Sequence, residues 1–373
     1  MITVTPVRDR AGRRQFIDFP YLLYRGHPHW VPPPRLMESA RFKPGHPFFE
    51  HADMALFLAW TDGRPVGRIA AIDDRLHNET HRDNLADFGH FEAESEEAAS
   101  ALLDAAEAWA RERGRARIRG PLNSSLNESA GLLIDAFDVD PMVMMPYNPP
   151  EYAGFIERAG YRKAKDLFAW IIDLPGAIHT ERMSRVVAWF KSRHGLTIRS
   201  VNLSAFEAEI ERFVDVYCRA WAENWGFVKP TTAEARQLAS ELRYVVDADL
   251  VTAAEVDGRL VACAIALPDL NQVFKGTGGR LFPTGLLRLL ARKRIVTQVR
   301  LLLFGVVPEW RGTGLAAPLV VDLLTRAARR YTRAELSWVL EDNDLTNDSI
   351  ATLGGRRYKT YRVYEKELEE RTR

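Results

Sequence analysis

A glycine-containing turn at residues 311–316 carries the most specific chemistry in this sequence. The turn, Arg311–Ala316, follows an apolar run from Leu301 to Val307 that predicts a buried strand, and it precedes an apolar periodicity that predicts a helix. Glycines let the backbone turn tightly, so that successive N–H groups converge where the helix dipole is positive. We expect the turn to bind a diphosphate, because hydrogen bonds to charged groups contribute roughly 1.5–3 kcal/mol each. A glycine pair alone also marks an ordinary tight turn.

The sequence pattern also repeats, at an offset of 195 residues. The run Asp-Gly-Arg at 62–64 recurs at 257–259, and Asn148 recurs as Asn343. Matches that keep the same order along the chain indicate a duplicated unit. The predicted domains are residues 1–175 and 176–373, which meet at Pro175-Gly176.

Only the second copy keeps the glycine-containing turn. At the corresponding place the first copy reads Phe88 to Glu97, which lacks the Arg-x-x-Gly-x-Ala spacing and contains four carboxylates. Carboxylates repel a diphosphate. We therefore expect the second copy to carry the chemistry and the first copy to form a wall of the site.

Each copy has the same predicted order of elements around these residues. A short strand and an amphipathic helix precede two strands joined by an Asp-Gly turn, which is a strong hairpin signal. A long helix, a strand, a helix that ends at a glycine and a final strand follow. The order predicts an α/β (α+β) fold in tandem, with two mixed β-sheets flanked by helices. The long helices are expected at 96–113 and 314–330, the final strands at 167–172 and 361–365, a linking helix at 184–193, and insertions at 120–146 and 276–298.

Composition narrows the classes of function. The 373 residues carry a formal net charge of +1, so no global basic field indicates a nucleic-acid partner. Two cysteines, Cys218 and Cys263, exclude a disulfide framework. The first residues lack an apolar signal core, and no run reaches 18 apolar residues, so we expect a soluble cytoplasmic protein.

The order of strand, Arg311-x-x-Gly314-x-Ala316, helix and strand, followed by Asn343 and Asn347 before Gly355, resembles the GCN5-related N-acetyltransferase (GNAT) superfamily. Both copies match that order, as in a bacterial tandem subfamily. The resemblance implies that the strand at 305–307 pairs with pantetheine and that the turn binds the pyrophosphate of acetyl-CoA or a longer acyl-CoA, without a metal. The implied cofactor-binding residues are Val306, Val307, Arg311, Gly312, Thr313, Gly314, Leu315, Ala316 and Asn347.

Because the first copy lacks the turn and its four carboxylates would repel a diphosphate, we expect no CoA in that copy. One departure concerns the general acid. Many family members have a tyrosine four residues before the glycine of the last helix, where it protonates the leaving thiolate; here Ala351 occupies that place. The sequence therefore leaves the general acid unassigned.

Transfer of an acyl group to an amine needs a neutral nucleophile, a route for its proton and donors at the thioester oxygen. Glu341 and Asp342 end a predicted strand where the sheet should open around the thioester, or they are solvated or cap a helix. Asn343 and Asn347 share a helix face and could point at the pantetheine arm. Alternatively, Asn343 is an N-cap and Asn347 a surface residue. The predicted catalytic residues are Glu341, Asn343 and Asp269.

Two polar clusters are candidates for acceptor contacts. Asp269, Asn271 and Lys275 follow a predicted strand and either line an acceptor pocket or form a polar strand end. The polar run 123–128 in the first insertion is ordinary loop polarity or a source of acceptor contacts. His77–His81 places its glutamate at the third position rather than the second, so it does not match a zinc helix, and we expect no metal.

The segment 281–295 combines leucines with Arg288, Arg292, Lys293 and Arg294. A basic amphipathic helix of this kind makes peripheral contact with a membrane or covers a lipid substrate. The alternative is that it packs between domains with its cations solvated.

These observations lead to one function and two alternatives. We expect an acyl-CoA-dependent N-acyltransferase in which a small-molecule or lipid amine, such as a sphingoid base, attacks the thioester directly. One alternative is an aminoacyl-tRNA-dependent peptidyl transferase of tandem GNAT fold, which would need a broad cationic RNA surface. The other is a non-catalytic acyl-CoA sensor. The sequence does not determine the oligomeric state.

Overall fold

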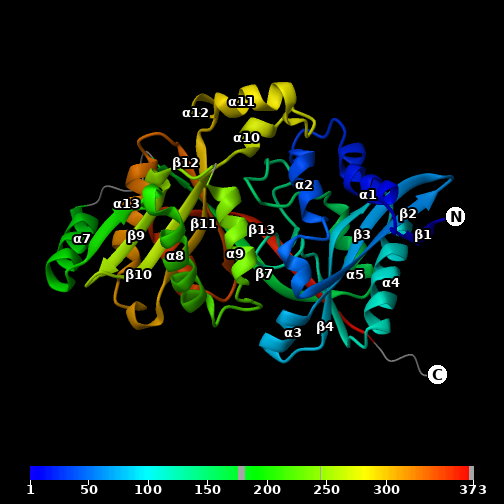
Figure 1. Ribbon diagram of the computed structural model, residues 1–373, viewed down its shortest axis with the longest axis horizontal. Coiled ribbons are helices and arrows are strands. Elements are labelled where there is room, and N and C mark those ends of the chain that lie inside the picture. Colours follow the sequence, from blue (N-terminus) through cyan, green and yellow to red (C-terminus); the bar gives the residue numbers. More distant parts are fainter. Residues whose placement is uncertain (175–180, 244, 369–373) are drawn as a thin grey trace. The chain divides into compact units, whose positions relative to one another are not determined.

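The computed structural model describes residues 1–174, 181–243 and 245–368 of the chain. It divides into two compact units (Figure 1). Unit 1 contains Met1–Leu167, Val273–Leu290 and the described chain from Lys359 onward, and unit 2 contains Phe168–Gln272 and Ala291–Tyr358. The predicted junction at Pro175-Gly176 lies outside the described residues, and the domain boundary at 175/176 stays a prediction.

Unit 1 is a mixed sheet in the order β1-β2-β3-β4-β5-β13. The last strand of the sequence, β13, pairs antiparallel with β5, whereas β4 and β5 are parallel. Its strands are β1 Thr3–Pro6, β2 Ala52–Thr61, β3 Arg64–Asp74, β4 Leu85–Ala93, β5 Arg117–Gly120, the short β6 Leu132–Leu133, the first half of β7 Arg162–Asp173, and β13 Arg356–Glu367 from Lys359 onward; its helices are α1 Arg10–Leu23, α2 Arg35–Arg41, α3 Arg75–His81, α4 Glu96–Glu112, α5 Glu151–Arg158 and α11 Leu286–Leu290.

Helices cover both faces of this sheet. Leu102 and Ala106 of α4 pack with Ile69 of β3 on one face. On the other face Phe16 of α1 packs with Ala70. Alternation along β3 therefore sends successive side chains into two separate cores, as expected for a strand buried on both sides.

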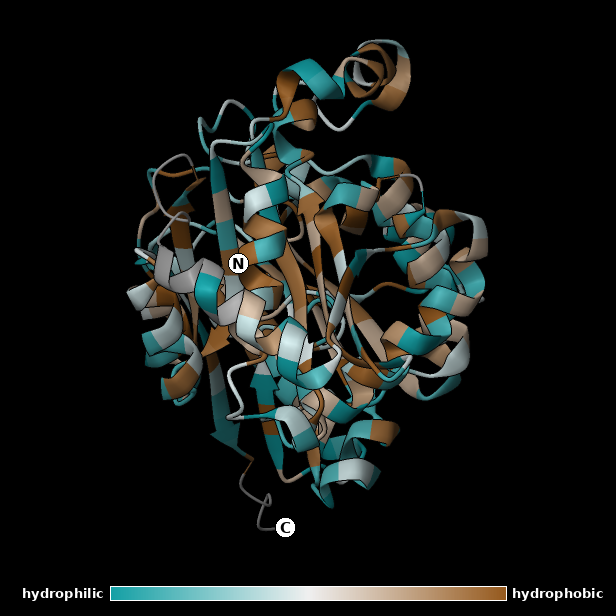
Figure 2. Cartoon of the chain, turned by 90° about the vertical axis from the view of Figure 1, so that its left-hand side faces the viewer, coloured by the Kyte–Doolittle hydropathy of each residue, from teal (hydrophilic) through white to brown (hydrophobic). Residues whose placement is uncertain are grey.

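Unit 2 repeats the arrangement in the order β8-β9-β10-β11-β12, with the second half of β7 beside β12. Figure 2 shows that the strands are largely hydrophobic and that the helices carry hydrophilic residues as well. Its strands are β8 Thr197–Ser200, β9 Val251–Val256, β10 Arg259–Pro268, β11 Gln298–Val306 and β12 Arg333–Leu340; its helices are α7 Glu181–His194, α8 Phe206–Trp221, α9 Thr232–Leu242, α12 Arg292–Ile295, α13 Ala316–Ala327 and α14 Asp344–Thr352. The short helix α10 Asn271–Phe274 is divided between the units after Gln272. The predicted α/β fold class, with mixed β-sheet flanked by helices in each unit, is confirmed.

Both predicted Asp-Gly hairpins are present. Asp62 and Gly63 have φ angles of 49° and 73°, and Asp257 and Gly258 have φ angles of 50° and 75°. Positive φ at both central residues is the backbone of a type I′ turn, whose twist matches that of the flanking strands. The turns fix the registers of β2 with β3 and of β9 with β10.

Several element boundaries differ from the sequence prediction. The second long helix begins at Ala316 rather than Gly314, and the final strands are longer, at Arg162–Asp173 and Arg356–Glu367. The segment 281–295 is not one amphipathic helix: it consists of a turn at Leu281–Gly285 followed by α11 and α12. Phe282 precedes Pro283 and is extended, with φ −108° and ψ 143°, because proline disfavours the helical conformation in the residue before it.

The parallel pair of strands differs between the units. In unit 2, β11 and β12 pair from Gln298↔Arg333 to Leu301↔Leu336. In unit 1, β4 and β5 pair from Leu85 to Asp87, and the chain after β5 continues along β4. Leu122 N donates to Phe88 O at 2.8 Å, and His90 N donates to Asn123 Oδ1 at 2.6 Å. The first insertion therefore occupies the edge of β4 in unit 1.

The close approach of Leu122 to Gly89 predicts the effect of adding one methyl group at position 89. A Cβ at Gly89 would lie 1.6 Å from Leu122 O, which is backbone and cannot rotate away. Gly89→Ala should lower the free energy of unfolding by about 3 kcal/mol or more, measured by chemical denaturation. Gly45→Ala is the control, because its Cβ would meet nothing within 4 Å. Equal stabilities of the two variants would contradict the closure.

Candidate active site

The predicted diphosphate-binding turn lies between β11 and α13. Gly312 and Gly314 have φ angles of 71° and 91°, which L side chains rarely adopt. Residues 311–314 are exposed, whereas Leu315 is buried and anchors the turn to the core. The first N–H groups of α13 have no partner within the helix, so an exposed turn at this end can bind an anion.

The side chains around this turn hold its shape. The guanidinium group of Arg311 donates to Glu223 Oε2 at 2.9 Å and to Ala220 O at 2.6 Å. Thr313 Oγ1 donates to Trp310 O at 2.7 Å. Both side chains thus fix the turn from within unit 2, and the groups that it offers to a ligand are backbone N–H groups.

Beyond the last described pair with β12, no further strand is described on this edge of β11, where Trp221 Nε1 donates to Phe304 O at 3.0 Å; we call this stretch the open edge of β11. The ladder between β11 and β12 is described up to Leu301↔Leu336, while β11 continues to Val306. Val307 N donates to Val261 O at 3.0 Å, so Val307 faces β10 and Val306 directs its backbone N–H and C=O away from β10. Of the two predicted residues, Val306 is thus placed to pair with an extended arm, whereas the N–H of Val307 is used inside the sheet.

A bulge lies at the start of this open edge. Ile265 of β10 faces Leu303 and Ala266 faces Leu301, so Leu302 has no partner in β10. An unpaired residue in a bulge frees its backbone groups and re-aims them. Leu302, Leu303 and Phe304 are half-buried, which gives the edge an apolar lining.

The asparagines predicted to face the arm have structural contacts. Asn343 caps α14, because its Oδ1 accepts from Thr346 N at 3.2 Å. Asn347 is half-buried: its Nδ2 donates to Leu340 O at 3.0 Å, and its Oδ1 accepts from Trp170 Nε1 at 3.0 Å. The capping alternative for Asn343 is therefore what the structure contains, and Asn347 ties α14 to β12 and β7. Their roles toward a substrate stay predictions.

The remaining predicted residues are spread over both units. Glu341 is half-buried and directly follows β12. Asp269 is buried after β10, and its Oδ1 accepts from Asn271 N at 3.2 Å. Lys275 belongs to unit 1, where it forms an ion pair with Asp140. The structure therefore does not group Lys275 with Asp269 and Asn271 in one unit.

The structure reveals a buried polar network in unit 2 that sequence reasoning missed. Arg300 Nε donates to Ser337 Oγ at 2.9 Å and lies 3.6 Å from Glu335 Oε1. Ser337 Oγ donates to Glu335 Oε1 at 2.6 Å, and Tyr358 OH donates to Glu335 Oε2. Arg300 and Glu335 stand opposite each other in the ladder. The signal in the sequence was a charged residue between apolar neighbours in each strand, Arg300 between Val299 and Leu301 and Glu335 between Ala334 and Leu336.

In unit 1 the segment that corresponds to the turn, residues 88–97, leads into α4. Side chains of this segment cap the start of that helix. Ser95 caps α4 by accepting from Ala98 N, and Glu96 and Glu97 lie in the first helical turn, where carboxylates stabilise the dipole. Glu92 is buried and accepts from Tyr24 at 2.5 Å and Tyr152 at 3.1 Å. Burial raises the pKa of Glu92 to about 7. That no diphosphate binds here stays a prediction.

The polar run 123–128 also has partners inside unit 1. Asn123 binds the β4 edge, and Glu128 Oε2 accepts from Arg41 at 2.8 Å. His77 is buried in α3, and burial, with Arg119 and His81 nearby, lowers its pKa to about 3. His77 is therefore neutral and packs as a core residue.

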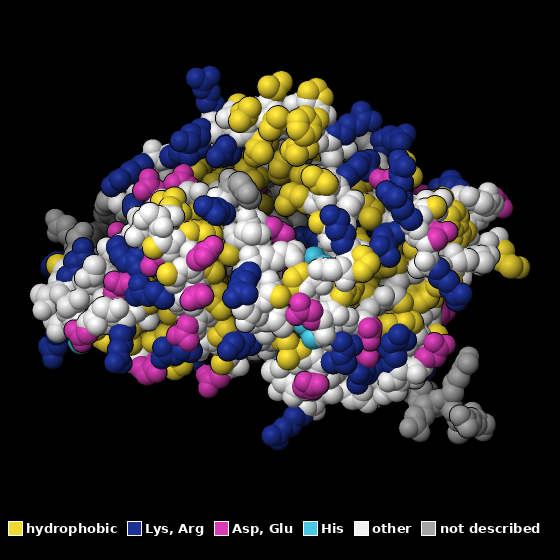
Figure 3. Space-filling view, in the orientation of Figure 1, with side chains coloured by type: hydrophobic (Ala, Val, Ile, Leu, Met, Phe, Trp, Pro, Cys, Tyr) yellow, Lys and Arg dark blue, Asp and Glu magenta, His cyan; other side chains and the backbone are white. Residues whose placement is uncertain are grey.

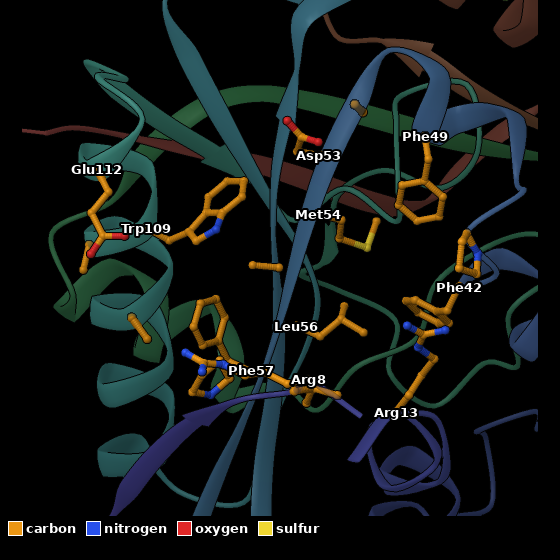
Figure 4. Close-up of a pocket in the computed structure, with 17 residues that line it drawn as sticks. Arg8, Arg13, Phe42, Phe49, Asp53, Met54, Leu56, Phe57, Trp109 and Glu112 are labelled. Atoms are coloured by element: carbon orange, nitrogen blue, oxygen red, sulfur yellow. The ribbon is translucent and has the colours of Figure 1, made fainter. Parts of the chain in front are cut away.

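A hollow of about 830 Å³ lies along β2 in unit 1 (Figure 4). Met54 and Leu56 of β2 line it together with Trp109 of α4 and Phe49. Its lining, drawn from the described residues, includes none of the predicted site residues.

Exposed apolar side chains lie on α11 and in the turn before it. Phe282, Leu287 and Leu290 are 69%, 65% and 69% exposed. Figure 3 shows hydrophobic side chains gathered at the edge of the molecule where α11 lies, with lysine and arginine side chains nearby. Among the described helices, none has the length and apolar character that crossing a bilayer requires.

Comparison with known proteins identifies the family. No family model matches the chain. It is 37% identical over 378 residues to a protein of Caulobacter vibrioides named bacterial ceramide synthase, with 98% of each chain covered. It is 34% identical over 368 residues to protein YghO of Escherichia coli K12, which covers 96% of this chain and 94% of YghO.

Among solved structures, the chain is similar to a tandem GNAT protein from the clavulanic acid biosynthesis pathway, with a TM-score of 0.60, 15% identity and 99% of both chains covered. At this identity the likeness concerns the fold. It agrees with the mixed β-sheet flanked by helices that each unit contains. The chain therefore has the tandem GNAT fold and belongs to the family of the bacterial ceramide synthase and YghO.

Proposed function

We propose that the chain is an acyl-CoA-dependent N-acyltransferase whose donor site lies in unit 2. The observation that carries the proposal is the exposed turn at 311–316, which lies at the end of the open edge of β11 and at the start of α13. The pyrophosphate would bind the backbone N–H groups of the turn, and the pantetheine arm would pair with Val306. The thioester would then lie near the Leu302 bulge, where a backbone group outside the regular ladder with β10 could serve its oxygen.

The cysteines favour direct attack of the amine over an acyl-enzyme. A cysteine nucleophile must ionise, which requires an electropositive and accessible environment. Cys263 is fully buried, and burial raises the pKa of its thiol well above the usual range. Burial also raises the pKa of Cys218.

We further propose that the acceptor is a long-chain amine of the sphingoid type and that the acyl donor is long-chain. The relative named bacterial ceramide synthase supports this acceptor class, because it covers the whole chain. The segment around α11 supports contact with an anionic membrane, where such lipids reside: it exposes three large apolar side chains, and no aspartate or glutamate occurs between Leu270 and Pro308.

Gly314→Asp should abolish donor binding. Its side chain would obstruct the backbone approach, and its charge would repel the diphosphate. Gly258→Asp is the matched control, since Gly258 also has positive φ in unit 2 but lies in a hairpin. Calorimetric titration with CoA should give no measurable heat for Gly314→Asp and parental affinity for Gly258→Asp. Parental affinity in a folded Gly314→Asp would refute the phosphate-turn assignment.

The parent should bind one CoA per chain. Unit 1 lacks the turn, and its own chain covers the edge of β4. The same calorimetry gives the stoichiometry, and two equivalent sites would contradict the assignment to unit 2. Binding without turnover, with sphingoid amines and both short and long acyl-CoA, would favour the sensor alternative.

Replacing Leu287 and Leu290 by serine should weaken binding to vesicles of mixed zwitterionic and anionic phospholipid by about tenfold or more. Burying each leucine contributes roughly 1.5–3 kcal/mol, so partial insertion is sufficient for this effect. Leu286 is half-buried and stays unchanged. The control replaces Leu203 and Leu238, which are exposed elsewhere, by serine. If both double variants are folded and sediment equally with vesicles, membrane contact through α11 is excluded.

A further inference from the structure

The polar network in unit 2 lies where β11 and β12 part. Leu301↔Leu336 is the last described pair of the ladder, and Ser337 is the next residue of β12. Arg300 shares a sheet face with Gly305, because their partners in β10, Leu267 and Cys263, are four residues apart. The network therefore lies at the point from which the open edge of β11 begins.

The duplicated unit separates what is structural in this network from what is specific to unit 2. Unit 1 has an ion pair across the corresponding ladder, with the charges exchanged: Arg119 Nε donates to Asp87 Oδ1 at 2.9 Å. An ion pair at this place therefore does not depend on the diphosphate-binding turn. Two residues after Arg119 the chain has Pro121, whereas two residues after Glu335 it has Ser337. The hydroxyl group of Ser337, where β11 and β12 separate, therefore has no counterpart at Pro121 in unit 1.

The donors and acceptors of the network form one continuous chain of hydrogen bonds. Ser337 Oγ accepts from Arg300 and donates to Glu335, and Tyr358 donates to the other oxygen of the same carboxylate. Glu335 is completely buried, and the Arg300 guanidinium group neutralises its charge. Ser337 is buried and Tyr358 is half-buried, so the chain of hydrogen bonds runs from a buried hydroxyl group, where the strands separate, through a buried carboxylate to a more accessible phenol.

We propose that Ser337 and Glu335 accept the proton of the attacking amine, an inference that rests on the proposed function. When the amine nitrogen bonds to the thioester carbon, its N–H proton passes to Ser337 Oγ while the hydroxyl proton of Ser337 passes to Glu335. The C–S bond then breaks, and the same proton returns through Ser337 to the thiolate. An amine and a thioester thus become an amide and a thiol, and Ser337 and Glu335 end as they began. Tyr358 positions the carboxylate.

The test compares variants of the full-length chain with sphinganine and palmitoyl-CoA as substrates. Ser337→Ala should lower kcat by about 100-fold or more, which is the usual contribution of a general base, and should leave the dissociation constant for CoA unchanged. Ser337→Thr keeps the hydroxyl and should recover activity to within about tenfold of the parent. Glu335→Gln should lose activity as Ser337→Ala does.

Asp87→Asn is the matched control for Glu335→Gln, since both remove the charge of a buried carboxylate paired with arginine. It should lower thermal stability and leave kcat per folded molecule unchanged. A folded Ser337→Ala that binds CoA and retains kcat within about threefold of the parent would overturn the proposal, whatever its thermal stability. Absence of turnover in the parent would overturn the proposed function itself, and with it this role.

Discussion

The end of the parallel ladder between β11 and β12 is the constraint on which the rest of unit 2 depends. Up to Leu301 the two strands satisfy each other's backbone groups, and beyond it β11 continues with Val306 directed away from β10. A strand edge inside a protein needs a partner. An extended arm of a substrate is such a partner, and the turn at the start of α13 supplies the anion-binding N–H groups at the end of the same strand.

The strand edge next to the parallel pair is arranged differently in the two units. In unit 1 the chain after β5 turns onto β4, and Gly89 is needed because Leu122 O leaves no room for a Cβ. The helix start that follows is capped by Ser95 and carries carboxylates instead of glycines. The duplication therefore allows the two strand edges to be compared. In unit 1 the chain after β5 covers the edge of β4, whereas in unit 2 no described strand covers the corresponding edge of β11.

A buried ion pair crosses the ladder in each unit, with arginine and carboxylate exchanged. Removing one partner of such a pair typically lowers stability by about 3–5 kcal/mol, because the other charge is left buried and uncompensated. The pair therefore holds both strands in register up to the point where they separate. In unit 2 the same carboxylate also bonds to Ser337 and Tyr358, so one residue serves both the register and the local chemistry.

The sequence by itself determined the features that arise from neighbouring residues. The Asp-Gly turns, the helix beginning at Glu96 and the glycines at 312 and 314 were predictable, because turn conformation and helical periodicity act over a few positions. The segment 281–295 shows the limit of periodicity, since Pro283 interrupts the pattern of leucines and arginines.

Only the tertiary structure decided which distant residues meet. Arg300, Glu335 and Tyr358 lie far apart in sequence, and the parallel register and the order of strands bring them together. The membership of 273–290 and of the end of β13 in unit 1, and the closure of Gly89 by Leu122, likewise follow from packing. A pattern in one strand predicts which face is buried, but the partner across the strand depends on register, which the whole sheet sets.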